Sequence, residues 1–203
     1  SSPTHTSPMP LFGPSGLPDA FPEVRATDLD GKDLTLPAGL PAELVLVVVL
    51  FRDEMDPLAD QWARLGHSIE ERHPERFAVV ETPVVGRGMK LFGGLATVGI
   101  RGQVDGEQEH ARTLPIYVDK KSFRKALHVS KETDVYPFLV HRDTGRILWG
   151  GEGEIDMDEV QGLESAVTEA LESPPEPLPP PDEDAPAMAD DDRDGTPSTN
   201  EEL

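Results

Sequence analysis

Three carboxylates follow the longest apolar run of the chain. Asp53, Glu54 and Asp56 come directly after residues 44–51, whose sequence is LVLVVVLF. In open α/β sheets ligands bind beyond the carboxyl ends of the strands, so these side chains are the first candidates for chemistry. Together they could bind a hard cation such as Ca²⁺ or Mg²⁺, or one could act as a general acid or base. The structural alternative is that Asp56 caps a helix and the other two stabilise its positive end.

Most other catalytic chemistries lack the residues or the spacing that they need. The chain has no cysteine, which excludes a thiol nucleophile, a redox dithiol and a thiolate metal site. The six histidines show neither His-x-x-x-His nor His-Glu-x-x-His spacing, so we expect no metal and no cofactor. The glycine clusters at 86–88 and 93–94 match neither of two phosphate-binding patterns, Gly-x-x-x-x-Gly-Lys-Ser/Thr and Gly-x-Gly-x-x-Gly. Ser122 and Ser130 lie in no nucleophile-elbow motif.

The elements that would position the carboxylates follow from the apolar periodicity. Residues 44–51 are apolar on both faces, as in a central strand that is covered on both sides. Asp56 and Pro57 then fit the start of a helix, which we expect to end near His73. The predicted buried stripe of this helix consists of Leu58, Trp62, Leu65 and Ile69.

Strands and helices alternate along the rest of the chain. Further strands are predicted at 24–29, 33–36, 77–81, 114–118, 135–140 and 146–149. Further helices are predicted within 89–100, at 120–127, and after Asp156, which forms a capping box with Glu159. The resulting order β-β-β-α-β-α-β-α-β-β-α predicts an α/β sandwich with a mixed central sheet, because an antiparallel hairpin closes an otherwise alternating chain.

Charge is distributed unevenly along the chain. Residues 1–150 hold 21 acidic and 17 basic side chains, whereas residues 151–203 hold 18 acidic side chains and one basic side chain. Nucleic acid is not an expected partner, because phosphate binding needs a basic face. The densest basic patch consists of Lys120, Lys121, Arg124 and Lys125. It is either a solvated helix face or a receiver for the acidic end of the chain or an anionic partner.

Composition divides the chain into three segments. We expect a disordered proline-rich lead at 1–20, a folded domain at 21–172 and a disordered acidic tail at 173–203. The tail contains eight prolines and ten acids, so it cannot bury enough apolar surface to offset its ordering entropy. No apolar run is long enough for a membrane span, although peripheral association stays open. We expect a cytoplasmic location, and a salt-adapted host is one explanation for the acidity.

The two ends of the predicted domain resemble the thioredoxin-like superfamily. FPEVRATDLDGKDLTLP is similar to the opening hairpin of its peroxiredoxin and membrane-anchored thioredoxin branch, and FLVHRDTGRILWGGEGE is similar to its closing hairpin. The resemblance covers residues 21–172 and implies a thioredoxin-like sandwich with an N-terminal β-hairpin extension and flanking helices. Uncharacterised bacterial and archaeal thioredoxin-like proteins are similar as well. Residues 122–154 also resemble the mitochondrial ATP synthase assembly factor family, which implies a chaperone-like role in assembling a membrane complex.

The resemblance also shows what this chain lacks. The superfamily has a reactive Cys-x-x-Cys motif after the central strand, and this chain has Met55 and Leu58 at the two cysteine positions. Neither side chain can form a thiolate, so a peroxidatic or disulfide mechanism is excluded for this chain acting alone. The cis-proline of the superfamily corresponds to Val135, and Pro137 follows two residues later. Since most X-Pro bonds are trans, the sequence does not support a cis bond at Pro137.

Three functions remain open at this stage. The first is a non-redox binding or assembly-factor module with a protein partner, because the peptide-binding surface of the superfamily can persist without its thiols. Its predicted binding residues are Asp53, Glu54, Met55, Asp56, Val135, Tyr136 and Pro137. The second is an enzyme of peroxiredoxin-like descent that uses carboxylates, recognisable by a pocket in which Asp53 and Glu54 have a raised pKa. The third is a protein of a salt-adapted host with no defined ligand.

Overall fold

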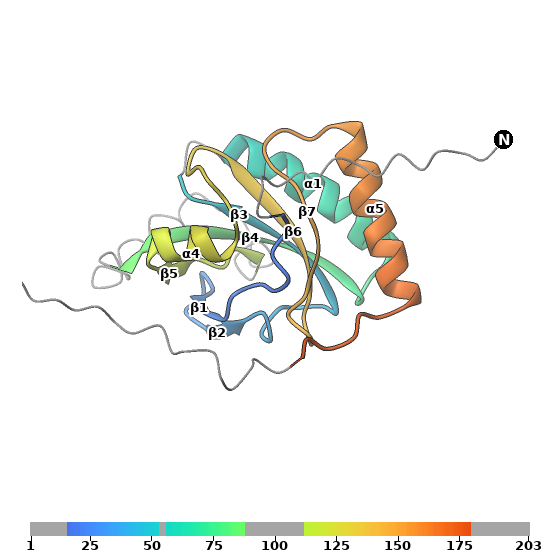
Figure 1. The fold of residues 1–203 in the computed structure, drawn as a ribbon, viewed down its shortest axis with the longest axis horizontal. Helices are drawn as coiled ribbons and strands as arrows, with labels where there is room; N and C mark the ends of the chain where they lie inside the picture. Colours follow the sequence, from blue (N-terminus) through green and yellow to red (C-terminus); the bar gives the residue numbers. More distant parts are fainter. Residues whose placement is uncertain (1–15, 53–55, 88–111, 180–203) are drawn as a thin grey trace, which may run out of the picture.

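A computed structural model describes residues 16–52, 56–87 and 112–179. In chain order its elements are β1 (Val24–Thr27), β2 (Asp33–Leu36), β3 (Leu44–Leu50), α1 (Asp56–Arg72), β4 (Phe77–Gly86), β5 (Ile116–Val118), α4 (Lys120–Ala126), β6 (Val135–His141), β7 (Ile147–Gly150) and α5 (Met157–Glu172). The strands form one sheet in the order β2-β1-β5-β4-β3-β6-β7 (Figure 1). This confirms the predicted α/β sandwich with a mixed sheet. The helix predicted within 89–100 lies outside the described residues.

The directions of the strands decide which segments meet at each edge of the sheet. β3, β4 and β5 are parallel neighbours, so their carboxyl ends lie at one edge. β6 is antiparallel to β3 and β7 is antiparallel to β6, so β6 begins at that same edge and β7 ends there. Toward the β2 end of the strand order, β1 pairs antiparallel with both β2 and β5.

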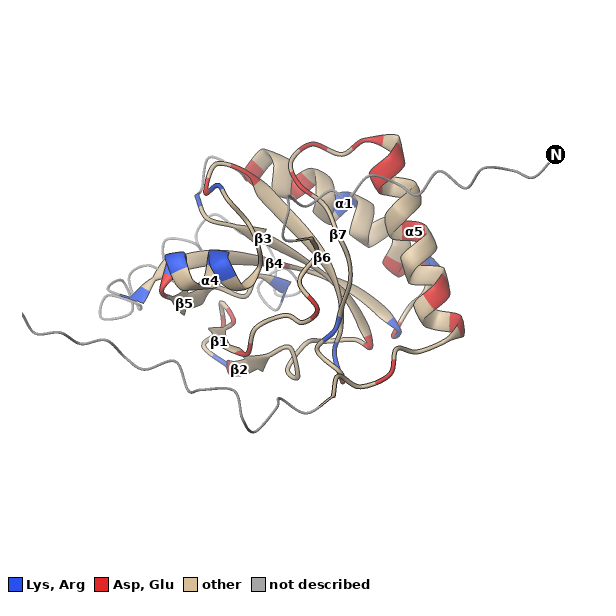
Figure 2. Cartoon of the chain, viewed as in Figure 1, with Lys and Arg blue, Asp and Glu red and all other residues tan. Residues whose placement is uncertain are grey.

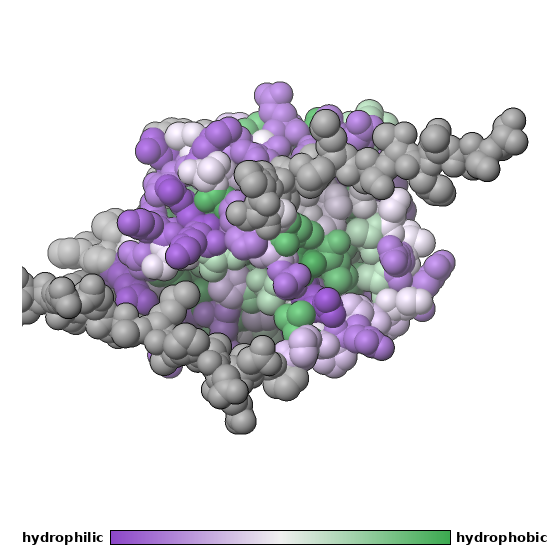
Figure 3. Space-filling model, viewed as in Figure 1, coloured by the Kyte–Doolittle hydropathy of each residue, from purple (hydrophilic) through white to green (hydrophobic). Residues whose placement is uncertain are grey.

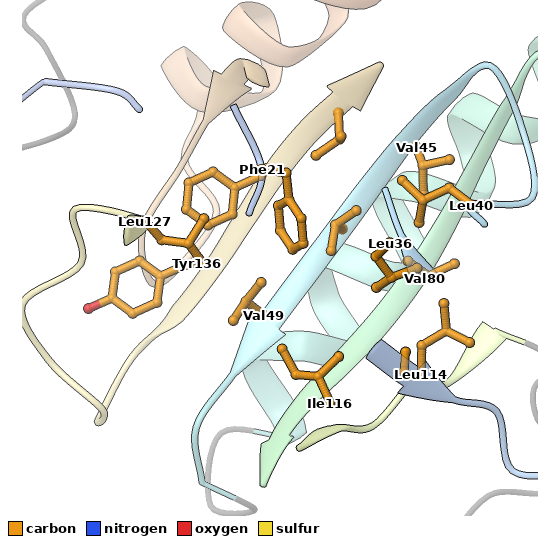
Figure 4. Packing of buried hydrophobic residues seen from close by; sticks show 14 of the residues in the cluster. Phe21, Leu36, Leu40, Val45, Val49, Val80, Leu114, Ile116, Leu127 and Tyr136 are labelled. Atoms are coloured by element: carbon orange, nitrogen blue, oxygen red, sulfur yellow. The ribbon is translucent and has the colours of Figure 1, made fainter. Parts of the chain in front are cut away.

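The central strand β3 is buried along its whole length, as its apolar sequence predicts. Alternate side chains point to opposite faces of a strand, and each face of β3 contributes to a separate core. Val45, Val47 and Val49 belong to the first cluster, with Tyr136 from β6 (Figure 4). The second cluster contains the other β3 side chains together with residues of α1 and α5, so these two helices cover one face of the sheet (Figure 1).

The buried face of α1 includes Trp62 and Ile69, as predicted, but it is rotated away from the two leucines of the predicted stripe. Its buried residues are Ala59, Trp62, Ala63, Gly66 and Ile69, whereas Leu58 and Leu65 are only partly buried. The stripe is shifted because small residues let the helix approach the sheet closely. A Cβ built on Gly66 would lie 2.7 Å from the Cβ of Val79 in β4. Within the described ranges, no helix is long and apolar enough to cross a membrane.

Strand β4 continues beyond its predicted end at residue 81. Thr82 and Val84 are both buried, and Val84 pairs with Ile116 of β5. The Thr82-Pro83 dipeptide reads as a strand end by propensity, but Pro83 still lies opposite Leu50 of β3. β4 therefore reaches as far as the end of β3 and brings its own end to the same edge.

Both flanks of the predicted domain contact it where they are described. The Ile147 amide donates to the carbonyl oxygen of Asp19 at 3.0 Å, and Ala20 bridges to Arg146. On the C-terminal side, the Arg146 Nη1 donates to the carbonyl oxygen of Glu176 at 3.1 Å. Residues from the lead and from the tail therefore meet at the start of β7.

Candidate functional site

The candidate site is the sheet edge at which the parallel strands end. We call it the carboxyl edge and define it by Phe51, Arg52, Asp56, Val135, the β7–α5 loop 151–156 and Met157, which follows that loop. Phe51 and Arg52 follow β3, and Asp56 is the first residue of α1. Val135 opens β6, and its carbonyl oxygen accepts a 2.8 Å hydrogen bond from the amide of Gly153 in the loop. Three segments that are distant in the sequence therefore converge there.

The acidic part of the predicted site is described only at its last residue. Asp53, Glu54 and Met55 lie outside the described residues. Asp56 is exposed and begins α1, where its charge faces the positive end of the helix. The hypotheses of a cation site and of a carboxylate pocket both need Asp53 and Glu54, so they remain predictions.

The β6 part of the predicted site is buried. Val135 and Tyr136 are 0% and 1% exposed, and Pro137 is buried as well. Val135 belongs to the core beneath α1 and α5, whereas Tyr136 belongs to the core on the opposite face. Among the described residues the one cis peptide bond is Leu36–Pro37, so the bond before Pro137 is trans. These three side chains are therefore not part of the exposed surface of the carboxyl edge.

Tyr136 fixes the segment that precedes β6. Its hydroxyl donates to the carbonyl oxygen of Lys131 at 3.1 Å and accepts from the Lys131 amide at 3.3 Å. Its ring packs edge-on against Phe51, with 6.3 Å between the ring centroids. Burial, and secondarily the charge of Glu152, raises the pKa of Tyr136 to about 12. The phenol is therefore neutral at physiological pH and acts as a structural hydrogen-bonding group.

A tryptophan pair fixes the β7–α5 loop. The Nε1 of Trp62 in α1 donates to the carbonyl oxygen of Gly153 at 2.8 Å. Trp62 also packs against Trp149 of β7, with 5.8 Å between the ring centroids. Gly153 has a φ of +79°, a conformation that glycine adopts without strain. Since Val135 bonds the amide of Gly153 and Trp62 bonds its carbonyl, the loop is attached to both β6 and α1.

Glu159 is a buried carboxylate at the base of this loop. It is 3% exposed, and its two carboxylate oxygens accept from the amides of Glu152 and Asp156, each at 3.3 Å. The side chain of Asp156 accepts from the Glu159 amide at 2.8 Å, which confirms the predicted capping box. Burial raises the pKa of Glu159, and its backbone donors oppose that rise. The burial of the Glu159 side chain was not predicted from the sequence. The glycine-rich segment directly before the capping box is a pattern that could have indicated it.

Charged side chains contact or belong to the segments that form the carboxyl edge. The Lys120 Nζ donates to the carbonyl oxygen of Phe51 at 3.0 Å, so it ties α4 to the end of β3. Lys131 Nζ lies 3.5 Å from Glu152 Oε1, so this pair links the segment before β6 to the loop. Arg52 is exposed. Sequence patterns gave no signal for these three contributions, because each depends on the fold and not on local spacing.

One large apolar side chain is exposed beside these charges. Met157, the first residue of α5, is 69% exposed, and it is the one exposed large hydrophobic residue in the described part of the chain. It directly follows the β7–α5 loop. Within the described ranges, no group of three or more histidine, aspartate and glutamate side chains is arranged to hold a metal ion. The described edge therefore offers polar and apolar contacts to a partner.

Comparison with known proteins places the fold. No family model matches the chain, and no curated protein matches it. Solved structures do match. A thiol:disulfide interchange protein DsbE from Chlorobium tepidum is 15% identical, with a TM-score of 0.50 over 76% of this chain and 97% of that chain. BsSco, a member of the Sco family of cytochrome c oxidase assembly proteins, is 15% identical, with a TM-score of 0.50 over 75% of this chain and 95% of that chain.

These likenesses establish the fold and no more, because the identities are low. Both likenesses extend over about three quarters of this chain, and the chain itself has a mixed seven-stranded sheet with flanking helices. The absence of cysteine from all 203 residues separates this chain from thiol chemistry. The chain has a thioredoxin-like α/β fold without a thiol.

Proposed function

We propose that this chain is a non-redox thioredoxin-like module that binds a protein partner at the carboxyl edge and assists the assembly of a protein complex. The observation that carries the proposal is that the edge is preorganised in a chain that has no thiol. Trp62 fixes the β7–α5 loop, Tyr136 fixes the segment before β6, and Lys120 fixes the end of β3. Preorganisation lowers the entropy cost of binding, so it favours recognition even where no reactive group is present.

The residues around Met157 indicate which partner would fit. Its neighbours Asp156 and Asp158 are exposed, and so is Glu154 in the preceding loop. A flexible thioether can adapt to an apolar side chain, and the surrounding carboxylates favour positive charge. The partner segment is therefore expected to present an apolar side chain flanked by lysine or arginine.

The assembly role has a separate source. Residues 122–154 resemble the mitochondrial ATP synthase assembly factor family, and this segment contains β6, β7 and most of the β7–α5 loop. The name of BsSco also refers to assembly, of cytochrome c oxidase, but at 15% identity that likeness contributes only the fold. The resemblance of the closing segment therefore supports assembly, and the geometry of the edge supports binding.

Affinity capture from a native extract tests the proposal, with four forms of the chain as bait. Wild type and Met157→Glu compare the intact edge with one that carries a charge at its apolar contact. Ser165→Glu is the matched control, because it adds the same charge at an exposed position further along α5. We expect Met157→Glu to recover roughly tenfold less partner, and Ser165→Glu to recover as much as wild type.

A chain that ends at Ser173 is the fourth bait and separates the domain from the acidic tail. If it retains the partner at low and high salt, recognition belongs to the folded domain, as proposed. Loss of the partner with the tail would move recognition to residues 174–203 and would contradict the proposal. Equal recovery by Met157→Glu and Ser165→Glu would contradict the placement at the carboxyl edge.

A further inference from the structure

We propose that the basic face of α4 is a docking surface for the acidic C-terminal segment of the same chain, residues 180–203. The α4 patch consists of Lys120, Lys121, Arg124 and Lys125. This inference does not depend on the proposed function, because it concerns a different surface and an occupant within the chain.

The α4 patch concentrates positive charge in one short helix. Four of the seven residues of α4 are basic. Lys121 and Lys125 are exposed, and neither ammonium group forms an ion pair among the described residues. They are four positions apart, so they lie on one helix face and repel each other by about 0.2–0.5 kcal/mol. This arrangement lowers the stability of the isolated helix, which favours a role in binding negative charge.

The figures show the contrast with the rest of the surface. In Figure 2 the ribbon of α4 is coloured blue at its basic residues, while red segments mark acidic residues along α5. In Figure 3 hydrophilic side chains gather over the same part of the molecule as α4. The positive face of α4 is therefore set apart from the acidic face of α5.

The helix that carries the patch is held firmly in place. Phe123 and Leu127 are buried in the core, and the side chain of Asp119 caps the helix by accepting from the Ser122 amide at 2.8 Å. Arg124 forms an ion pair with Glu132 at 3.0 Å, and Lys120 donates to Phe51. Lys121 and Lys125 therefore project from a helix that is anchored to the core.

The C-terminal segment has the charge that complements the α4 patch. Residues 180–203 contain nine acids and one base, Arg193, in a protein whose net charge is −21. A free anionic molecule is repelled by that net charge, whereas a tethered segment is held near the patch at an effective concentration in the millimolar range. The tether therefore favours the chain's own segment over a competing anion.

The segment is also long enough to reach the patch. The Arg146 guanidinium holds the carbonyl of Glu176, so the described chain leaves the domain near the start of β7. The acidic run at 190–192 begins 11 residues after Pro179. Extended chain covers up to about 3.6 Å per residue, so the run can lie about 40 Å from Pro179. A domain of this size has a radius of gyration of only about 15 Å, so the α4 patch is within reach.

Paramagnetic labelling of the full chain tests this docking. Because the chain has no cysteine, Ala187→Cys carries a single nitroxide label in the C-terminal segment. We expect the label to broaden the amide resonances of α4 and to leave those of α5 sharp at low salt. The broadening is expected to disappear at about 0.5 M NaCl, where screening shortens the range of electrostatic attraction.

Charge-reversed variants identify the groups that meet. Lys121→Glu/Lys125→Glu is expected to abolish the broadening. Asp190→Asn/Asp191→Asn/Asp192→Asn removes three of the nine acids of the segment and leaves the folded domain untouched, so it is expected to weaken the broadening. The matched control is Arg25→Glu/Arg64→Glu, which makes the same charge change at exposed positions of β1 and α1 and is expected to keep the broadening. Equal broadening of α4 and α5, or broadening that the removal of the charges at 190–192 leaves unchanged, would overturn the proposal.

Discussion

The indole Nε1 of Trp62 donates a 2.8 Å hydrogen bond to the carbonyl oxygen of Gly153, 91 residues further along the chain. This bond joins α1 to the β7–α5 loop, which is one of the segments of the carboxyl edge. The same glycine donates its amide to the carbonyl oxygen of Val135. Gly153 therefore links α1 to β6. Substitutions at the residues that contact it test whether these hydrogen bonds stabilise the carboxyl edge.

Replacement of Trp62 by phenylalanine is expected to destabilise the domain beyond the cost of the lost ring volume. The Gly153 carbonyl would lose its donor in a part-buried site, which costs about 1–3 kcal/mol. Trp149→Phe is the matched control, because it removes the partner indole, whose nitrogen forms no hydrogen bond among the described residues. Urea unfolding measures both free energies. An equal loss in the two variants would show that the hydrogen bond does not anchor the loop.

Replacement of Gly66 by alanine is expected to destabilise the domain although alanine is the better helix former. The new Cβ would lie 2.7 Å from the Cβ of Val79, an atom that cannot rotate away. Overpacking of this kind costs about 1–3 kcal/mol, which outweighs a gain of about 1 kcal/mol in helix propensity. Ser68→Ala, at an exposed position of α1, is the control and is expected to leave the melting temperature nearly unchanged. A higher melting temperature for Gly66→Ala would contradict the close approach of α1 to the sheet.

The buried faces of the helices show where sequence reasoning reaches its limit. Periodicity correctly placed α1 and α5, but in α1 it weighted leucines and so predicted a stripe that is rotated from the buried face. In α1 the closest approach is made by Gly66, and in α5 the buried positions include Glu159. A glycine and a glutamate are buried for reasons of distance and hydrogen bonding. Such distances and hydrogen bonds depend on the strand or loop that packs against the helix, so the sequence of the helix alone does not reveal them.

The strands were easier to predict than the site. The apolar run of β3 and the closing hairpin depend on local patterns, and the structure has both. The carboxyl edge depends on contacts such as Lys120 with the Phe51 carbonyl, which join residues 69 positions apart. Spacing within a motif carries no information about such a contact. For the same reason the sequence predicted a binding role for Tyr136, and it did not predict the burial of its ring.

Replacement of Thr82 by valine is expected to stabilise the domain. The Thr82 side chain is fully buried in β4, and its Oγ1 has no hydrogen-bond partner among the described residues. Valine has nearly the same shape and removes the unsatisfied hydroxyl, which gains about 1–2 kcal/mol. Thr27→Val is the control, because the Thr27 hydroxyl donates to Asp33 at 2.8 Å and its loss is expected to cost stability. Denaturant unfolding of both variants checks the sign. A destabilised Thr82→Val would mean that the hydroxyl has a partner in solution.

Replacement of Glu159 by glutamine is expected to change how stability depends on pH. Burial raises the pKa of Glu159 above its ordinary value of 4.5, so folding favours the protonated carboxyl. That contribution is fully present below the unfolded pKa and is lost as the pH rises through the folded pKa. Glutamine does not titrate, so the stability of wild type relative to Glu159→Gln is expected to be greatest in acid and to fall toward neutral pH.

Urea unfolding at a series of pH values measures this difference directly. Gln161→Asn, at an exposed position of the same helix, exchanges one neutral amide for another and is expected to differ from wild type by a constant amount at every pH. The carboxylate form of Glu159 accepts from the amides of both Glu152 and Asp156, and a glutamine has only one oxygen to offer them. Burial nevertheless raises the pKa of Glu159 against these two bonds, so the gap in unfolding free energy, wild type minus Glu159→Gln, is expected to narrow as the carboxyl ionises. A gap that stays constant or widens toward neutral pH would contradict a buried, desolvated carboxylate at the base of the β7–α5 loop.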